Sequence, residues 1–176
     1  METDAREPLR ETLIASLEEA ASTRDVDIVD VEVVGSKKNP TVRVRIDHAN
    51  AEDGPITLDE VSAETAWISD LLDELDPISG QFTLEVSSPG LSRPLRKPAD
   101  FERFAGSDVS LRLRGSEGRL RYTGRLDGLA DGMVSVTTDE GTFSWPLEEI
   151  VSCKIRPDFG DGGNGKGKRA NKKSRG

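Results

Sequence analysis

The feature that most constrains the fold is a change in the spacing of apolar residues near residue 106. Before that point, apolar side chains recur either every three to four residues or every second residue, which predicts both helices and one-sided strands. After it, only short alternating segments remain, separated by GSEG, ADG and DEG. Two such different patterns predict two structural units of different architecture, joined near the middle of the chain.

The first 86 residues are predicted to form helices and strands in the order helix, strand, strand, helix, strand. We expect a helix over 6–21, a hairpin of strands over 26–34 and 41–47, a second helix that begins at Thr57, and a strand over 81–86. A glutamate three residues after Thr57 has the spacing of a capping box. One-sided strands and amphipathic helices bury their apolar faces against each other, so a two-layer α/β sandwich is predicted.

The segment after residue 106 is predicted to be a small barrel of the SH3-like or Sm-like kind. Five short segments of strand character follow one another with glycine-containing turns and no long helix between them. Val109, Leu111 and Leu113 are expected to face inward, and Gly124 is expected to permit a sharp bend. The whole chain is therefore expected to belong to the α+β class.

These patterns predict four segments: an α/β domain over 1–86, a rigid proline-rich connector over 87–106, a barrel over 107–156 and a disordered basic tail over 157–176. Charge is distributed as unevenly as structure. Residues 1–86 hold 21 acidic and 7 basic side chains, whereas the last fifteen residues hold six basic side chains and no acidic one. The tail has too few apolar residues to bury a core, hence the expectation of disorder.

Catalytic and metal-binding groups are scarce in this sequence. A single cysteine, Cys153, excludes an internal disulfide and a cysteine metal cluster, and its alternation with Val151 and Ile155 predicts a buried thiol on the last strand. The single histidine, His48, lies at a strand end and is expected to be a surface residue. No apolar run is long enough to span a membrane, and the first residues lack a signal-peptide core. We expect a cytoplasmic binding protein without cofactor or metal, and not an enzyme.

Two clusters of basic residues are candidates for contact with RNA or protein. Arginines of the predicted barrel would form a positive side, unless they are ordinary outward-facing strand residues. The tail would contact phosphate, unless it is only a solubilising extension. Tyr122 is expected to face the core, and Trp67 and Trp145 are expected to serve packing rather than base stacking. The barrel candidates are Arg112, Arg114, Arg119, Arg121 and Arg125, and the tail candidates are Lys166, Lys168, Arg169, Lys172, Lys173 and Arg175.

The connector combines stiffness with positive charge. Three prolines and Gly90 restrict its backbone to turn and extended conformations. Arg93, Arg96 and Lys97 extend from that backbone, and either contact a partner or belong to a packed hinge whose charge is incidental.

The connector also carries a family resemblance. Its start, "LEVSSPGLSRPL" at 84–95, resembles the signature of RimP, the bacterial ribosome maturation factor family; "FERFAG" and "YTGRLDG" with "WPLEEI" extend the similarity. The resemblance implies an N-terminal α/β domain, a C-terminal SH3-like barrel and a monomeric factor in late assembly of the 30S subunit. The implied partners are the immature 30S particle, small-subunit ribosomal protein twelve and 16S rRNA. The candidate partner-binding residues of the connector are Ser87, Ser88, Pro89, Gly90, Leu91, Arg93, Pro94, Arg96 and Lys97.

Two other functions remain to be distinguished from this one. An Sm-like regulator of small RNAs would assemble as a hexameric or heptameric ring, so its size in solution would reveal it. An RNA hydrolase with clustered carboxylates would cleave precursor rRNA in the presence of metal.

Overall fold

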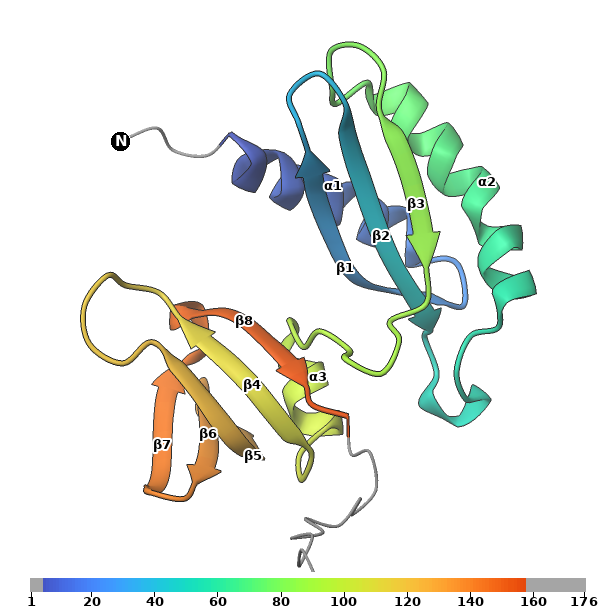
Figure 1. Ribbon diagram of the computed structural model, residues 1–176. Helices are drawn as coiled ribbons and strands as arrows, with labels where there is room; N and C mark the ends of the chain where they lie inside the picture. Colours follow the sequence, from blue (N-terminus) through green and yellow to red (C-terminus); the bar gives the residue numbers. More distant parts are fainter. Residues whose placement is uncertain (1–4, 158–176) are drawn as a thin grey trace, which may run out of the picture.

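The computed structural model describes residues 5–157, which form two sheets, each with its own helices (Figure 1). The first unit contains the helices and strands α1 (Arg6–Ala21), β1 (Val26–Gly35), β2 (Pro40–His48), α2 (Leu58–Leu75) and β3 (Thr83–Ser87), with a short 3-10 helix at Ala51–Asp53. The second unit contains α3 (Pro98–Arg103), β4 (Asp108–Leu113), β5 (Arg121–Ala130), β6 (Met133–Thr138), β7 (Gly141–Pro146) and β8 (Ile150–Ile155), with a 3-10 helix at Leu147–Glu149. The predicted α+β class and the predicted order of the first five elements are confirmed.

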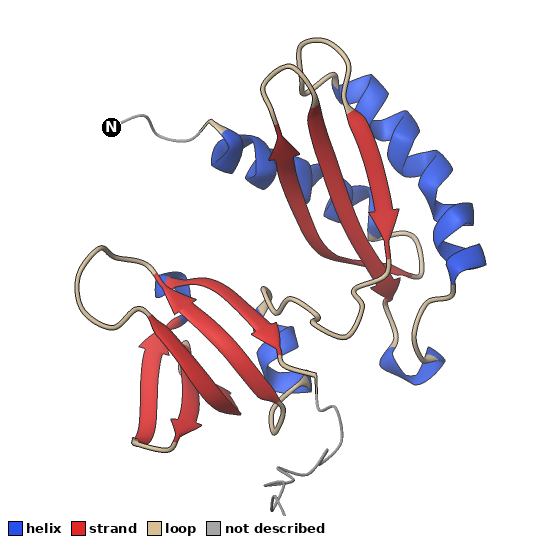
Figure 2. Ribbon diagram, viewed as in Figure 1, coloured by secondary structure: helices blue, strands red, loops and turns tan. Residues whose placement is uncertain are grey.

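The first sheet has three strands in the order β1-β2-β3, with β1 antiparallel and β3 parallel to β2. Helices α1 and α2 supply side chains to the same apolar core as the strands, which gives the predicted two layers (Figure 2). Leu13 of α1, Ile68 of α2 and Val42 of β2 are fully buried in that core. The capping box at the start of α2 is present, because the Thr57 side chain accepts from the Glu60 amide and the Glu60 carboxylate accepts from the Thr57 amide.

A bulge in β1 alters the simple alternation expected for that strand. The register with β2 shifts between Ile28 and Asp30, so residues 28–31 are all buried in succession. One of them is a carboxylate, Asp30, which is 7% exposed. Burial of an ionised group requires partners, and the ion pairs of Asp30 with α1 and β2 meet that need.

The second sheet has five antiparallel strands in the order β7-β6-β5-β4-β8. The end strands of this sheet are β7 and β8, and within residues 5–157 no strand pairing joins them. The sheet is curled (Figure 1), but its hydrogen bonds do not close it into a barrel. Val109, Leu111 and Leu113 are buried in its core, as predicted. Gly124 lies where β5 and β6 come close together, and a Cβ there would lie 2.3 Å from the Thr137 carbonyl oxygen.

The second half of the connector packs as part of the second sheet. Residues 93–95 run along the outer edge of β8, where the Leu95 amide donates to the Cys153 carbonyl at 2.8 Å and the Ile155 amide donates to the Arg93 carbonyl at 3.0 Å. Leu95 and Phe101 lie in the second core, with Phe101 fully buried. The connector is thus fixed to the second unit by backbone hydrogen bonds and by apolar packing.

Candidate functional site

The basic side chains of the connector extend from the second unit into the first. Arg93 donates to Asp47 through Nη1 and lies 3.3 Å from Asp27 through Nη2. All three side chains are largely buried, with exposed fractions of 7% for Arg93, 20% for Asp27 and 11% for Asp47. The Arg93 guanidinium also lies 5.0 Å from the centroid of the Phe104 ring, at the end of α3.

Arg96 and Lys97 make a second set of contacts with the same unit. Arg96 donates to the Glu18 carboxylate and, at 3.2 Å, to the Ile28 carbonyl, while Lys97 donates to Asp27. We call the six charged residues Arg93, Arg96, Lys97, Glu18, Asp27 and Asp47 the connector ion-pair network. Because three cations of one unit meet three carboxylates of the other, the network holds the two units in one relative orientation.

The network leaves little of the connector charge for other contacts. Arg93 is almost fully buried, and its Nε and that of Arg96 are buried without a hydrogen-bond partner. The structure thus gives these cations the contacts of a packed hinge. A partner-binding role for Arg93, Arg96 and Lys97 stays a prediction.

The first half of the connector borders a mostly apolar groove of about 530 Å³ between the two units. Ser88, Pro89, Gly90 and Leu91 line it, and Leu91 is 73% exposed. Ser87 ends β3, and Pro94 forms an isolated bridge with a residue of β8. Their predicted roles in partner binding are likewise not tested by these positions.

The predicted arginines of the second unit gather on the outer face of its sheet. Arg112 of β4 lies directly opposite Arg121 of β5, and Arg125 follows four residues later on the same face. Lys154 of β8 lies opposite Ser110 of β4, so it joins the same surface. We call Arg112, Arg114, Arg121, Arg125 and Lys154 the cationic face; all five are exposed, and within residues 5–157 none of them forms an ion pair.

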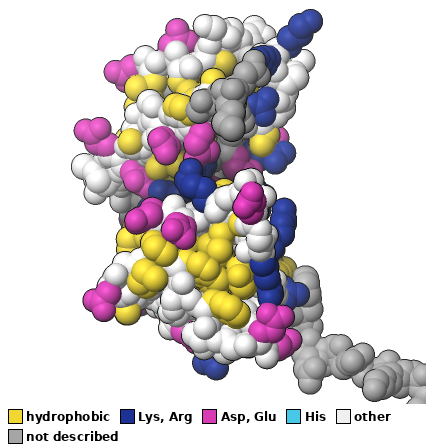
Figure 3. Space-filling view, turned by 90° about the vertical axis from the view of Figure 1, so that its left-hand side faces the viewer, with side chains coloured by type: hydrophobic (Ala, Val, Ile, Leu, Met, Phe, Trp, Pro, Cys, Tyr) yellow, Lys and Arg dark blue, Asp and Glu magenta, His cyan; other side chains and the backbone are white. Residues whose placement is uncertain are grey.

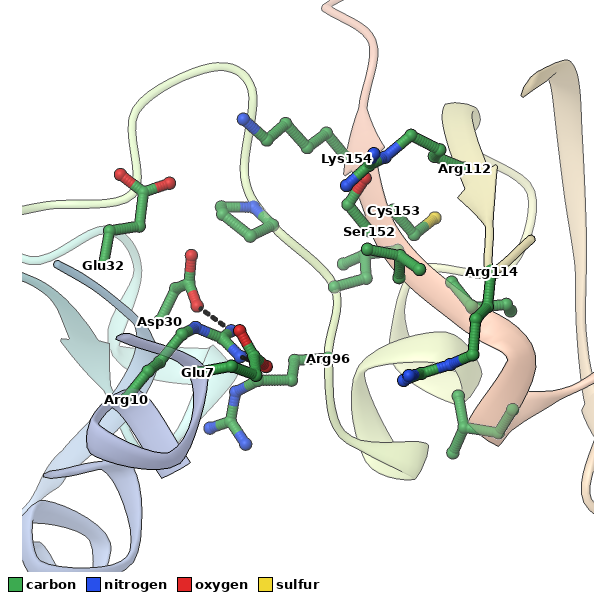
Figure 4. Close-up of a pocket in the computed structure, with 15 residues that line it drawn as sticks. Glu7, Arg10, Asp30, Glu32, Arg96, Arg112, Arg114, Ser152, Cys153 and Lys154 are labelled. Atoms are coloured by element: carbon green, nitrogen blue, oxygen red, sulfur yellow. Dashed lines mark hydrogen bonds and ion pairs between the residues drawn. The ribbon is translucent and has the colours of Figure 1, made fainter. Parts of the chain in front are cut away.

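Part of the cationic face forms one wall of a cleft of about 570 Å³ between the two units. Arg112, Arg114 and Lys154 line one side, and the other side carries Asp30 and Glu32 (Figure 4). The acidic side is partly neutralised within the first unit. There Arg10 donates to Asp30 at 2.7 Å, and Arg45 donates to Glu32 at 3.2 Å. A polyanion is therefore attracted to the cationic face more strongly than a polycation is attracted to the opposite wall.

The comparison with known families matches the first of the two units. Residues 16–92 match the family model described as the RimP N-terminal domain. The first unit is thus similar to the N-terminal domain of RimP, a family of ribosome maturation factors that is not among the known enzyme families. The three carboxylates of the connector ion-pair network lie inside the matched RimP domain, and its three cations follow directly after residue 92.

Some residues of this protein were missed or placed differently by sequence reasoning. Lys154 was missed, although its alternation with buried Cys153 on the last strand is a signal for an outward side chain. Arg119 was grouped with the other arginines, but it donates to Glu140 at 2.6 Å and lies over the Tyr122 ring. The six basic residues predicted for the tail lie outside the described residues.

The single cysteine of this protein lies in structural surroundings. Cys153 is buried in the second core, as predicted, and burial raises the pKa of its thiol to about 12. The thiol therefore stays protonated at neutral pH, which makes it a poor nucleophile. Among residues 5–157, there is no group of three or more His, Cys, Asp or Glu side chains that could hold a metal ion. The helices of the same residues include none that is long and apolar enough to cross a membrane.

His48 is expected to titrate above the ordinary range of histidine. Its Nδ1 donates to the Gly54 carbonyl at 2.9 Å and its Nε2 lies 3.2 Å from Glu60; the first contact and then the second raise its pKa above 6.5. Because the protonated form gains these partners on folding, the stabilisation is complete below pH 6.5 and is lost as pH rises through the raised pKa. His48 is the single histidine in the chain, so one ring resonance followed by NMR against pH reports it without ambiguity.

The control for this titration is Glu60→Gln, which keeps an oxygen acceptor for the start of α2 but removes the negative charge. The variant is expected to lower the pKa of His48 toward its ordinary value. A wild-type pKa at or below 6.5 would contradict the protonated contact with Glu60.

Proposed function

We propose that this protein assists late assembly of the 30S ribosomal subunit in the cytoplasm. It binds the immature particle as a monomer and contacts small-subunit ribosomal protein twelve and 16S rRNA. The observation that carries the proposal is the RimP N-terminal domain at residues 16–92. The segregation of charge between the two units supports it further.

Each unit suits a different component of the immature particle. Residues 1–86, with 21 acidic and 7 basic side chains, complement a basic ribosomal protein and reduce its wrong contacts with RNA. The cationic face suits rRNA phosphates, because its side chains have no ion-pair partner among residues 5–157 to be displaced first. Phosphate contacts of this kind weaken as the salt concentration rises, because the release of counterions from the RNA on binding then becomes less favourable.

The test of the assembly role is a strain that lacks the gene. Sucrose-gradient profiles are expected to show an excess of free 30S particles over assembled ribosomes, together with unprocessed small-subunit rRNA. Re-expression of the intact chain restores both. Normal profiles and normal rRNA processing in the deletion strain would refute the proposal, and a ring-sized species in light scattering would favour a small-RNA regulator instead.

The cationic face is tested by replacing two of its members that line the cleft, Arg112 and Lys154, with alanine. The double variant is expected to bind immature 30S particles about tenfold or more weakly, because each lost phosphate contact removes favourable counterion release. The slope of log affinity against log salt is expected to fall by roughly 0.7 to 0.9 for each lost contact. Cosedimentation or filter binding at several salt concentrations measures both quantities.

The matched control replaces Lys37 and Lys38, two exposed residues of the turn between β1 and β2, with alanine. It changes the net charge by the same amount but leaves the cationic face intact. Equal weakening by the two double variants would mean that net charge alone matters, which would contradict a specific docking role for this face.

A further inference from the structure

Three aromatic side chains form a cluster on the second unit that the assembly role does not explain. The ring centroids of Tyr122 and Trp145 are 4.6 Å apart, and those of Tyr122 and Phe143 are 5.2 Å apart. Phe143 and Trp145 lie nearly parallel, with an angle of 8° and centroids 6.1 Å apart. We call Tyr122, Phe143 and Trp145 the aromatic cluster. All three side chains are half-buried, so part of each stays accessible.

The members of the aromatic cluster differ in how the core holds them. Tyr122 and Trp145 pack against the buried residues of the second core, as predicted for both. In the part of the chain that the structure describes, Phe143 is not among the side chains that pack there, and its ring contacts are with the other two rings. It lies on β7, an end strand of the sheet. A large ring held only by other rings at a sheet edge contributes less to the core than its size would allow.

The surroundings of the aromatic cluster indicate what kind of group it receives. The Arg119 guanidinium lies 4.5 Å from the Tyr122 centroid and is held by Glu140, so a flat, delocalised group already stacks on this cluster. Arg121 precedes Tyr122 in β5 and points to the opposite face of the sheet, where it lies opposite Arg112 on the cationic face. Figure 3 shows apolar side chains gathered on the half of the molecule that holds the second sheet, beside a column of basic side chains.

We propose that the aromatic cluster is a stacking site for unpaired bases of single-stranded RNA, with a phosphate on Arg119. Aromatic rings beside cations are the usual components of such sites, because every base has a π-face and every nucleotide has a phosphate. A basic peptide is disfavoured, since Arg119 at the cluster would repel it. The inference deepens the proposed function, on which it rests, by naming unpaired rRNA as the element that the second unit contacts.

The test uses the fluorescence of Trp145 in a Trp67→Phe background, where Trp145 is the single tryptophan. The full chain is titrated with a single-stranded oligouridine and with an abasic ribose-phosphate chain of the same length and charge. We expect oligouridine to quench the fluorescence and to bind on the order of tenfold or more tightly than the abasic chain, as stacking of at least one base requires. Equal affinity for the two chains would overturn the proposal, because phosphate contacts alone would then account for binding.

Variants separate stacking from folding. Phe143→Leu keeps an apolar side chain but removes the ring, and it is expected to reduce the preference for oligouridine to near that for the abasic chain. A substitution at a remote exposed site, Leu58→Ala at the start of α2, is expected to change neither affinity. Glu140→Gln releases Arg119 from its ion pair and is expected to tighten binding of both oligonucleotides. An unchanged preference in Phe143→Leu with an intact melting transition would contradict a role for the cluster.

The result is distinguishable from a failure of the proposed function. A protein that does not prefer bases, but still cosediments with immature 30S particles, would retain the assembly role and lose only the stacking site. An apolar peptide that protects Trp145 from a soluble quencher, where oligouridine does not, would assign the cluster to a protein partner and overturn the RNA proposal.

Discussion

Replacing Arg93 with alanine is expected to lower the free energy of unfolding by about 3–5 kcal/mol. The substitution leaves Asp47, which is 11% exposed, without its ion-pair partner, while Asp27 keeps its ion pair with Lys97. Removal of one member of a buried ion pair is costly because the remaining charge is left desolvated and unpaired. Urea denaturation followed by circular dichroism measures the loss.

Two further variants define the origin of this loss. Lys37→Ala removes an exposed cation of the first unit and is expected to change stability by less than about 0.5 kcal/mol. Arg93→Ala combined with Asp47→Asn removes the orphaned charge and is expected to recover part of the stability. A loss below about 1 kcal/mol in Arg93→Ala would contradict a structural role for the network. An unchanged radius of gyration by small-angle scattering would contradict its role in holding the two units together.

Replacing Phe101 with alanine is expected to cost about 3–5 kcal/mol in the second unit, because a fully buried ring of α3 is deleted from its core. Trp67 lies in α2 and Trp145 in β7, so single-tryptophan variants report the two units separately. The transition seen by Trp145 is expected to move to lower urea, with a smaller change for Trp67.

The control for Phe101→Ala is Leu91→Ala in the same connector. Leu91 is 73% exposed, so its side chain buries little apolar surface in the folded state. The free energy of unfolding is therefore expected to stay within about 0.5 kcal/mol of the wild type. Equal shifts of the Trp67 and Trp145 transitions in Phe101→Ala would show that the two units unfold as one cooperative body.

Local patterns in the sequence were sufficient to predict the helices and strands and which of their faces are buried. Apolar alternation identified Val109, Leu111 and Leu113 as core residues, and the Thr57 capping box marked the start of α2 within one residue. The pairing of β3 with β2 in parallel was not predictable in this way. It depends on the path of α2 across the sheet, and periodicity along the chain contains no information on that path.

The candidate site was harder to predict because its contacts join distant parts of the chain. Arg93 and Lys97 meet Asp27 across 66 and 70 residues, and nothing in the connector itself indicates an acidic partner. The sequence predicted a rigid, basic connector, but which residues its basic side chains contact depends on tertiary structure. The aromatic cluster was missed for the same reason, since Tyr122 meets Phe143 and Trp145 only through the register of β5, β6 and β7.

The pairing of residues 93–95 with β8 has a consequence for folding during synthesis. The first unit has all its strands once β3 has left the ribosome, so it can fold while the second is still being made. The second unit cannot complete its sheet at that stage, because Leu95 pairs with β8, the last strand among the described residues. This segment of the connector stays unpaired on the nascent chain until β8 emerges, and only then do the two units acquire their final orientation.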